Sequence, residues 1–427
     1  MKEIMPFMKR KEFLSIIGPR QSGKTTLLDI IKERLIKEIG IKENFIHIIT
    51  FEDRKILREF EADPVEFIGS FISSKENELS YIMIDEFQYA DEGGQKLKLI
   101  YDTVKNVKII ITGSSSLEIK ALVGKYMVGR ILSFNIYPFN FGEYLKVTDE
   151  RLEKIYRGNR KNALGWIDGS NNWAAKSKKD MFHEEMIKQF EKYCIWGGYP
   201  AVVLSGTDTE RQKVLRDNYN NYVLKDIKGL LELATEKNLF LLSQYLATQI
   251  SNITVYQNLA QVSGVNFRQV KKYLGILAET YICDELRPFF VNRQKELSKN
   301  PKIFFTDMGF RNNLVENFNG LATRMDSGAI VENSVFISLR EIFKGLNKLN
   351  FWRTKSGAEV DFVIQSKGEI IPLEVKYSDF KEAKITKSLA SFIDCFKPKK
   401  SIVATKNFFG SMKKNNTEVV FLPVYYI

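Results

Sequence analysis

The first 150 residues alternate short apolar runs with stretches in which apolar residues recur at helical spacing. The apolar runs lie at residues 13–17, 44–51, 81–84 and 107–111. Buried strands of a parallel sheet are continuously apolar, and a helix connects each strand to the next. The pattern therefore predicts an α/β domain over residues 1–150, built on a parallel sheet.

The middle of the chain changes to helical spacing with few apolar runs. Residues 151–235 predict a helical connector, in which 157–180 is rich in Gly, Asn, Ser and Lys and indicates a surface insertion. Residues 236–298 predict helix, short turn, helix and strand, the order of a winged helix-turn-helix. Winged helices bind DNA and also dock proteins, so both roles stay open. The second helix carries residue types that contact phosphates and base edges: Asn266, Arg268, Gln269, Lys271 and Lys272.

Residues 299–427 return to α/β character, with a strand at 302–306 and a helix at 328–343. Further strands are predicted at 350–354, 359–365 and 369–376. This order predicts a separate C-terminal α/β domain.

Four charged residues of that domain lie on its predicted helix and strands: Glu332 on the helix, Asp361 on one strand, and Glu374 with Lys376 on the next. Residues two apart on a strand share a face, and a turn at 366–368 brings Asp361 opposite Glu374. Asp361 and Glu374 are therefore candidate Mg²⁺ ligands of a nuclease, with Lys376 beside the attacking water and Glu332 orienting the site. An inert domain used for docking and an ordinary salt-bridged hairpin are the alternatives.

A glycine-rich segment follows the first apolar run and precedes a helical pattern. Its spacing is that of a phosphate-binding loop, and a plain glycine turn is the alternative. Backbone N–H groups and the helix N-terminus attract phosphate, Lys24 reaches the β- and γ-phosphates, and the Thr25 hydroxyl is a ligand for Mg²⁺. The predicted ATP-binding residues are Gly18, Pro19, Arg20, Gln21, Ser22, Gly23, Lys24, Thr25 and Thr26.

Two carboxylate residues, Asp85 and Glu86, directly follow the third apolar run. This is the carboxyl end of the predicted strand, where open α/β sheets bind their ligands. Asp85 is the candidate Mg²⁺ ligand and Glu86 the residue that polarises the attacking water. A surface acidic pair is the alternative. The fourth run ends in Thr112-Gly113-Ser114, where Ser114 either senses the γ-phosphate or belongs to a simple turn.

The composition is 44% hydrophobic and 27% charged, which is typical of a globular protein. The sequence contains no apolar run long enough to cross a membrane, and its N-terminus lacks a secretory pattern, so a cytoplasmic protein is expected. The three cysteines are far apart and argue against a zinc site. A formal net charge of +12 favours an acidic partner such as nucleic acid, although a lysine-rich surface alone gives the same value.

The chain resembles one family over nearly its whole length, in the ordered motifs GPRQSGKTT, YIMIDEFQ, IIITGSSS, GR followed by YPFNFGEYL, WGGYP, FFTDMGFRN, WRTKSGAEVDFVI and LEVK. It comprises archaeal and bacterial AAA+-type ATPases whose C-terminal half is a domain of unknown function. The resemblance implies an N-terminal P-loop NTPase, a winged helix and a restriction-endonuclease-like domain, with ATP at residues 18–26. It also implies that Arg130 faces a γ-phosphate, in the same chain or in a neighbouring copy; a structural arginine paired to a local carboxylate is the alternative.

These patterns together give the hypothesis of an ATPase that uses Mg²⁺ and binds DNA, and whose ATP state controls the winged-helix and nuclease-like C-terminal half. The assembly of identical copies is left open. Metal-dependent DNA cleavage is a second activity within this hypothesis. The alternative is a STAND-like signalling ATPase with a protein partner and an inert nuclease-like docking domain.

Overall fold

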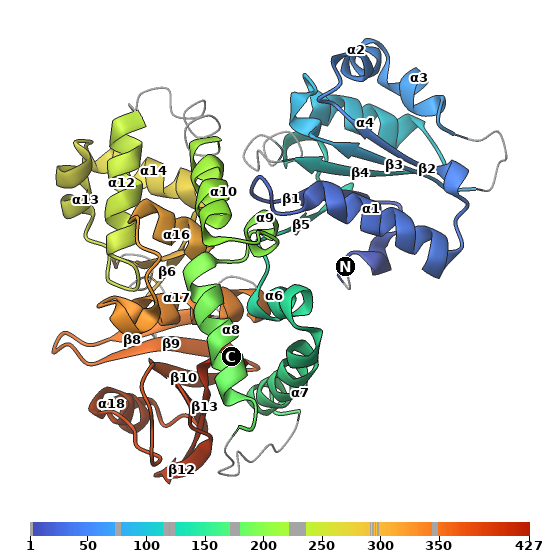
Figure 1. Cartoon of the computed structure of the whole chain (residues 1–427). Coiled ribbons are helices and arrows are strands. Elements are labelled where there is room, and N and C mark those ends of the chain that lie inside the picture. The colour runs from blue at the N-terminus through green and yellow to red at the C-terminus, as the bar shows by residue number, and fades with distance from the viewer. Residues whose placement is uncertain are drawn as a thin grey trace. The chain divides into compact units, whose positions relative to one another are not determined.

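The computed structural model describes residues 3–72, 78–113, 119, 124–170, 180–221, 236–290, 292, 294, 296, 299–343 and 349–427. The chain divides into two units (Figure 1). The first contains Met1–Pro138 with Glu279–Tyr281, and the second contains Phe139–Ala278 with Ile282–Ile427.

The first unit is built on a five-stranded sheet in the order β2-β3-β4-β1-β5, and every pairing in it is parallel. The predicted parallel α/β fold is therefore confirmed. One strand, β5, was not predicted, because its residues are only partly buried and lack a continuous apolar run. The strands are β1 (Phe13–Ile17), β2 (Ile46–Thr50), β3 (Ser80–Asp85), β4 (Val107–Gly113) and β5 (Ile131–Asn135).

Helices connect these strands and cover the sheet (Figure 1). Asp53 and Asp63 each accept hydrogen bonds from backbone N–H groups at the start of a helix, which fixes where α2 and α3 begin. The helices are α1 (Lys24–Arg34), which continues as a π-helical turn (Leu35–Ile39), α2 (Arg54–Ala62), α3 (Pro64–Gly69) and α4 (Gly93–Thr103).

The second unit begins with helices that pack into one large core. The expectation that residues 157–180 form an insertion without regular structure is wrong up to Ile167, because α7 buries Tyr156, Ala163 and Trp166 on one face. Residues 171–179 lie outside the described part. The helices are α6 (Phe141–Thr148), α7 (Glu150–Ile167), α8 (His183–Trp196), α9 (Pro200–Val203), α10 (Asp208–Asn221), α12 (Glu236–Thr248), α13 (Tyr256–Ser263), α14 (Phe267–Glu279), α16 (Met308–Leu314), α17 (Ser327–Ile342) and α18 (Lys387–Phe396).

Two sheets complete the second unit. β6 (Cys283–Leu286) pairs antiparallel with β7 (Lys302–Phe305). A six-stranded mixed sheet has the order β12-β13-β11-β10-β9-β8, which gives the separate C-terminal α/β region that was predicted. Its strands are β8 (Leu349–Arg353), β9 (Glu359–Ser366), β10 (Glu369–Lys376), β11 (Lys400–Thr405), β12 (Gly410–Lys414) and β13 (Thr417–Pro423).

Candidate functional site

The phosphate loop leaves the end of β1 and enters α1 at Lys24. Gln21 and Gly23 have left-handed backbones, with φ of 59° and 90°, which turns the loop back toward the helix. In this structure the Lys24 side chain is buried, and its Nζ donates to the carbonyl oxygens of Gly18 at 3.1 Å and Pro19 at 2.8 Å. Phosphate oxygens can replace these two acceptors, because an ammonium group binds either.

Gly18 is required for a steric reason. A Cβ at this position would lie 2.4 Å from the carbonyl oxygen of Ile136 and 3.2 Å from the Ser22 hydroxyl. Ser22 in turn donates to the carbonyl oxygen of Pro19 at 2.8 Å. The first glycine of the motif therefore lets the loop pass close to the segment that follows β5.

Asp85 lies at the carboxyl end of β3 and links three parts of the unit. Its Oδ2 accepts a hydrogen bond from Thr25 Oγ1 at 2.6 Å, and its Oδ1 accepts from Thr112 Oγ1 and from the backbone N–H of Glu86 at 3.1 Å. The loop, β3 and β4 thus meet at one carboxylate. Thr112 was not among the predicted site residues; its hydroxyl at the end of an apolar strand was the available signal.

Glu86 follows Asp85 with a left-handed backbone, φ 54°, so its side chain leaves the strand direction. Gln88 donates a hydrogen bond from Nε2 to Glu86 Oε2. The structure therefore places Asp85 and Glu86 at the same sheet edge as the phosphate loop. Ser114, the other predicted residue here, lies outside the described part.

The oxygen donors at this edge fit Mg²⁺. The metal prefers oxygen ligands and usually takes one or two protein groups together with substrate phosphates and water. Thr25 Oγ1 and Asp85 Oδ2 already lie within hydrogen-bonding distance of each other. Across the described residues there is no group of three or more His, Cys, Asp or Glu that could hold a metal by itself.

Arg130 does not lie at this edge. The residue precedes β5, whose Ile131 pairs with Phe13 at the beginning of β1, and Phe13 N donates to the Arg130 carbonyl. The phosphate loop begins at the other end of β1, about 16 Å away for five residues at about 3.3 Å each. Arg130 instead forms an ion pair with Asp102 at 3.2 Å. The predicted contact with the γ-phosphate of its own chain is therefore wrong.

The charged residues predicted in the C-terminal sheet do gather. Leu373 pairs with Phe362, so Asp361 lies opposite Glu374, and Asp361 Oδ2 accepts from the backbone N–H of Val375 at 2.8 Å. Lys376 Nζ lies 3.1 Å from Glu374 Oε1. Both Glu374 carboxylate oxygens also accept from the Thr386 hydroxyl at 2.8 Å.

Lys302 is the residue that sequence reasoning missed in this cluster. Its side chain is 1% exposed, and its Nζ lies 3.0 Å from Glu332 and 2.5 Å from Glu359. Burial raises the pKa of Glu332 to about 8 and also raises the pKa of Asp361, while Lys302 opposes both shifts. The pKa of Lys302 is raised, because these carboxylates outweigh its own burial.

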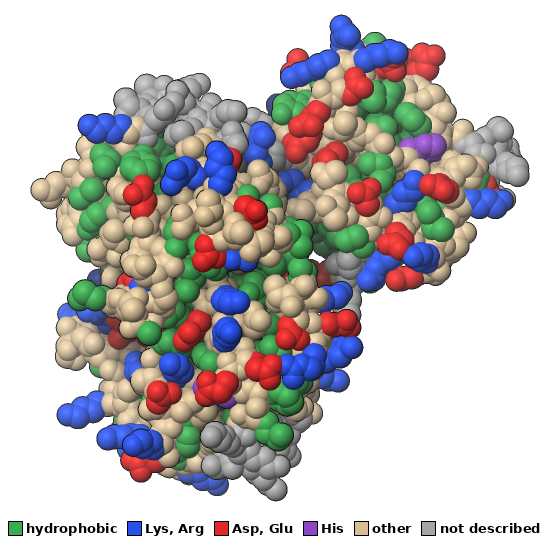
Figure 2. Space-filling model, viewed as in Figure 1, with side chains coloured by type: hydrophobic (Ala, Val, Ile, Leu, Met, Phe, Trp, Pro, Cys, Tyr) green, Lys and Arg blue, Asp and Glu red, His purple; other side chains and the backbone are tan. Residues whose placement is uncertain are grey.

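The predicted helix-turn-helix consists of α13 and α14, joined through Gly264 with φ of 68°. Asn266 and Gln269 form a reciprocal cap of α14, each accepting the other's backbone N–H at 3.0 Å, so neither side chain projects as predicted toward a base. Arg268, Lys271 and Lys272 are exposed. Basic and acidic side chains are interspersed on the face seen in Figure 2.

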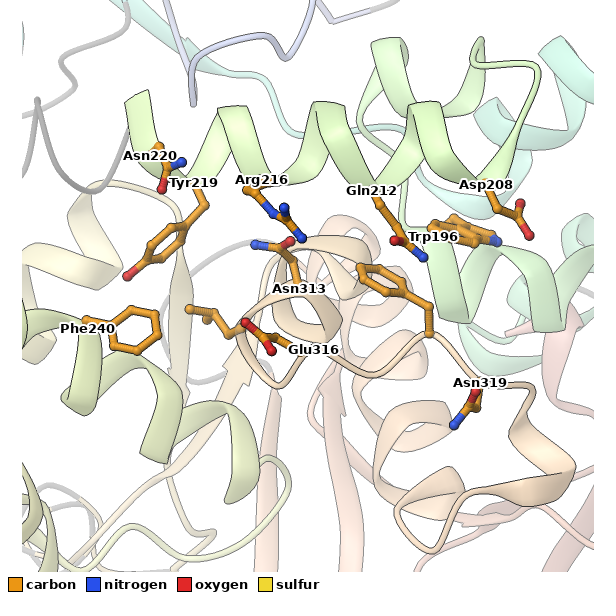
Figure 3. Close-up of a pocket in the computed structure, with 12 residues that line it drawn as sticks. Trp196, Asp208, Gln212, Arg216, Tyr219, Asn220, Phe240, Asn313, Glu316 and Asn319 are labelled. Carbon is orange, nitrogen blue, oxygen red and sulfur yellow. The ribbon is translucent and has the colours of Figure 1, made fainter.

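A cavity of about 610 Å³ lies among α10, α12 and the end of α16 (Figure 3). Gln212 and Arg216 of α10 face Asn313 and Glu316, with Trp196 and Phe240 at its ends. It contains no predicted site residue. Because its acidic and basic groups are mixed, its lining selects no single ligand chemistry.

Three family models match separate parts of this chain. Residues 10–145 match an AAA domain, residues 187–321 a domain of unknown function (DUF8612), and residues 327–425 another domain of unknown function (DUF4143). The AAA match and the parallel sheet support an AAA+-type P-loop ATPase family. This fold implies nucleotide binding. The winged helix and the nuclease-like domain stay predictions.

The curated relatives include two uncharacterized proteins. The protein of Haemophilus influenzae is 23% identical to this chain, and the alignment covers 97% of this chain and 94% of that protein. The protein of Methanocaldococcus jannaschii is 24% identical, and the alignment covers 82% of this chain and 71% of that protein.

The solved structures include the Walker-type ATPase of Pyrococcus abyssi, 16% identical with a TM-score of 0.41, covering 73% of this chain and 93% of that one. They also include the Aeropyrum pernix ORC1 protein in complex with DNA, 13% identical with a TM-score of 0.28, covering 72% and 87%. No helix in the described residues is long and apolar enough to cross a membrane.

Proposed function

We propose that this chain is an ATPase that uses Mg²⁺ and binds DNA through its second unit. One observation supports the ATPase most directly: the 2.6 Å hydrogen bond from Thr25 Oγ1 to Asp85 Oδ2. It joins the phosphate loop to the acidic end of β3, at the edge where open α/β sheets bind their ligands.

Each residue at this edge of the sheet has a separate role in phosphoryl transfer. Lys24 exchanges its two carbonyl acceptors for the β- and γ-phosphates, and the backbone N–H groups of the loop surround them. Thr25 and Asp85 would hold Mg²⁺, which neutralises charge on the phosphate oxygens when bound. Glu86, steadied by Gln88, orients the attacking water and accepts its proton.

DNA binding is proposed from the charge of the chain and from α14. The net charge is +12, and Arg268, Lys271 and Lys272 project from one helix of the predicted winged region. A protein partner on the same surface is the alternative. Duplex affinity that falls steeply with salt supports DNA binding, and absence of affinity at low salt supports the protein partner.

We propose that the C-terminal carboxylate cluster is an ion-pair network and not a nuclease site. Asp361 Oδ2 accepts from the Val375 N–H, and both Glu374 oxygens accept from the Thr386 hydroxyl, with Lys376 Nζ beside them. Lys302 is ion-paired with Glu332 and Glu359, and its charge also opposes the rise in the pKa of Asp361, so a fixed cation already balances this cluster. Because lysine charges already balance these carboxylates, the cluster fits Mg²⁺ poorly.

The ATPase is tested with three variants. Lys24→Ala should lose most binding of a fluorescent ATP analogue, because the loop loses its cation. Glu86→Gln should bind ATP normally but release phosphate at least about 100-fold more slowly than wild type. Lys32→Ala, which lies further along the same helix α1 and is paired with Glu43, is the control and should match wild type. Wild-type hydrolysis by Glu86→Gln would remove Glu86 from the mechanism, and wild-type protein that binds no ATP would remove the proposal.

A further inference from the structure

A groove with a volume of about 390 Å³ lies beside the first turn of α14. Its size falls within the range of small-ligand sites. It is lined by residues from the α13 N-terminus, α14, β6 and the segment before β7: Val255, Tyr256, Gln257, Phe267, Lys271, Glu285, Arg287, Lys299 and Asn300. All of them belong to the second unit.

The groove exposes an aromatic surface. Tyr256 and Phe267 contact each other edge to face, with ring centroids 5.7 Å apart. Phe267 is 46% exposed and the neighbouring Val255 is 39% exposed, although both are large and apolar. Leaving this surface in water forgoes the free energy that burying it would give. A ligand with a flat apolar face would recover it.

Positive charge surrounds the same rings. Lys271 Nζ lies 4.8 Å from the Phe267 centroid and 5.5 Å from the Tyr256 centroid. Arg287 contributes a second cation, paired at 2.6 Å with Glu285, the acid of the groove lining. Lys299 is a third and forms no ion pair with the described residues. The groove therefore offers three cations against one carboxylate.

We propose that this groove binds an unpaired nucleotide of a DNA strand. An unpaired base can stack on the exposed ring of Phe267 with its edge against Tyr256, while Lys299 and Arg287 bind its phosphates; this combination is typical of single-strand binding sites. Bases in a duplex are stacked on each other and cannot enter. A peptide of acidic residues alone would satisfy the cations but would leave the aromatic surface uncovered. The inference rests on the proposed DNA binding and specifies which DNA is preferred.

The test compares three fluorescent DNAs by anisotropy: a blunt duplex, the same duplex with a single-stranded tail, and the tail alone. Wild type should bind the tailed duplex about tenfold more tightly than the blunt one. Phe267→Ala should lose that preference and keep its blunt-duplex affinity, since stacking on an aromatic ring is worth roughly that factor per base. Lys299→Ala should reduce the salt dependence of binding to the tailed duplex by about one phosphate contact.

Val262→Ala is the matched control, because Val262 is 43% exposed on α13 but does not line the groove. Thermal melting checks that every variant folds. Equal affinity of wild type for blunt and tailed duplex overturns the inference and leaves duplex binding in place. No binding to any of the three DNAs overturns the proposed DNA function as well. Displacement of the tail by an acidic peptide at equal concentration would reassign the groove to a protein partner.

Discussion

Gly197 lies where two segments far apart in the sequence touch. It follows α8 with φ of 75°, and a Cβ here would lie 2.3 Å from Asp307 Oδ1. Asp307 caps α16 and also accepts from the backbone N–H of Gly198 at 2.6 Å. A Cβ on Gly309 would lie 2.0 Å from the carbonyl oxygen of Trp196. The WGGYP and TDMGF motifs are thus the two sides of one contact.

Gly197→Ala should destabilise the second unit by about 3 kcal/mol or more, because it adds both backbone strain and a clash with a buried carboxylate. Gly275→Ala is the control. It lies inside α14 with nothing within 4 Å of its Cβ, so it should be neutral or slightly stabilising. Urea denaturation measures both. A Gly197→Ala protein as stable as wild type would mean that the two segments can separate at little cost.

Asp326 neutralises two buried arginines, Arg311 and Arg324, at 2.7 and 2.8 Å. Burial pushes its pKa up, but hydrogen bonds and charges from the arginines outweigh burial and lower the pKa to about 2. An aspartate in the unfolded chain has a pKa of about 4, so the lowered pKa of Asp326 stabilises the fold fully at pH values above about 4. This contribution is lost as the pH falls toward 2.

Asp326→Asn should therefore cost about 3 kcal/mol at pH 7, since it leaves both guanidinium groups unpaired. The difference from wild type should shrink between pH 4 and pH 2, as the wild-type carboxylate becomes protonated. Urea denaturation across that range measures it. A constant difference would assign the loss to packing and not to charge.

At the scale of elements, the sequence predicted what depends on local spacing. Strand β1 and the hairpin β9–β10 lie where the apolar runs placed them, because their residues alternate or run apolar without interruption. Strand β5 was missed because it is only half-buried, and α7 was misread because its polar outer face hides the buried stripe. Lys302 was missed for another reason. Its partner Glu332 is 30 residues away in the sequence, and a local pattern of residues cannot predict a pair at that separation.

Lys302→Met should destabilise the C-terminal sheet by about 3 kcal/mol or more at pH 8, because it leaves Glu332 and Glu359 without their shared cation. In the variant the buried Glu332 carboxyl group favours the neutral form, so stability should recover as pH falls toward 5. Lys399→Met, which breaks an exposed pair with Glu369, should cost less than about 1 kcal/mol.

Thermal melting with added Mg²⁺ distinguishes an ion-pair network from a metal site in the C-terminal carboxylate cluster. An ion-pair network predicts the same melting temperature for wild type with Mg²⁺ or with EDTA. A rise with Mg²⁺ that is absent in Asp361→Ala would contradict the network and restore the nuclease hypothesis, because a metal that binds only the folded state stabilises it.

At the scale of the whole molecule, assembly decides whether Arg130 has a catalytic role. Within one chain it lies at the amino ends of the strands, opposite the phosphate loop. It is paired with Asp102 and lies over the ring of Tyr101, 5.8 Å from its centroid. These contacts explain the residue without any neighbouring copy.

Arg130→Ala should therefore change the rate of ATP hydrolysis by less than about twofold and cost under about 1 kcal/mol of stability, as expected for a partly exposed ion pair. Mixing it with Lys24→Ala should give only the activity of the Arg130→Ala copies. The opposite result would be a loss of about 10³-fold in Arg130→Ala that the Lys24→Ala copies restore, since an arginine supplied by a neighbour contributes on that scale. Phosphate release measured over a range of mixing ratios distinguishes them, because rescue across an interface peaks when both variants are present in equal amounts.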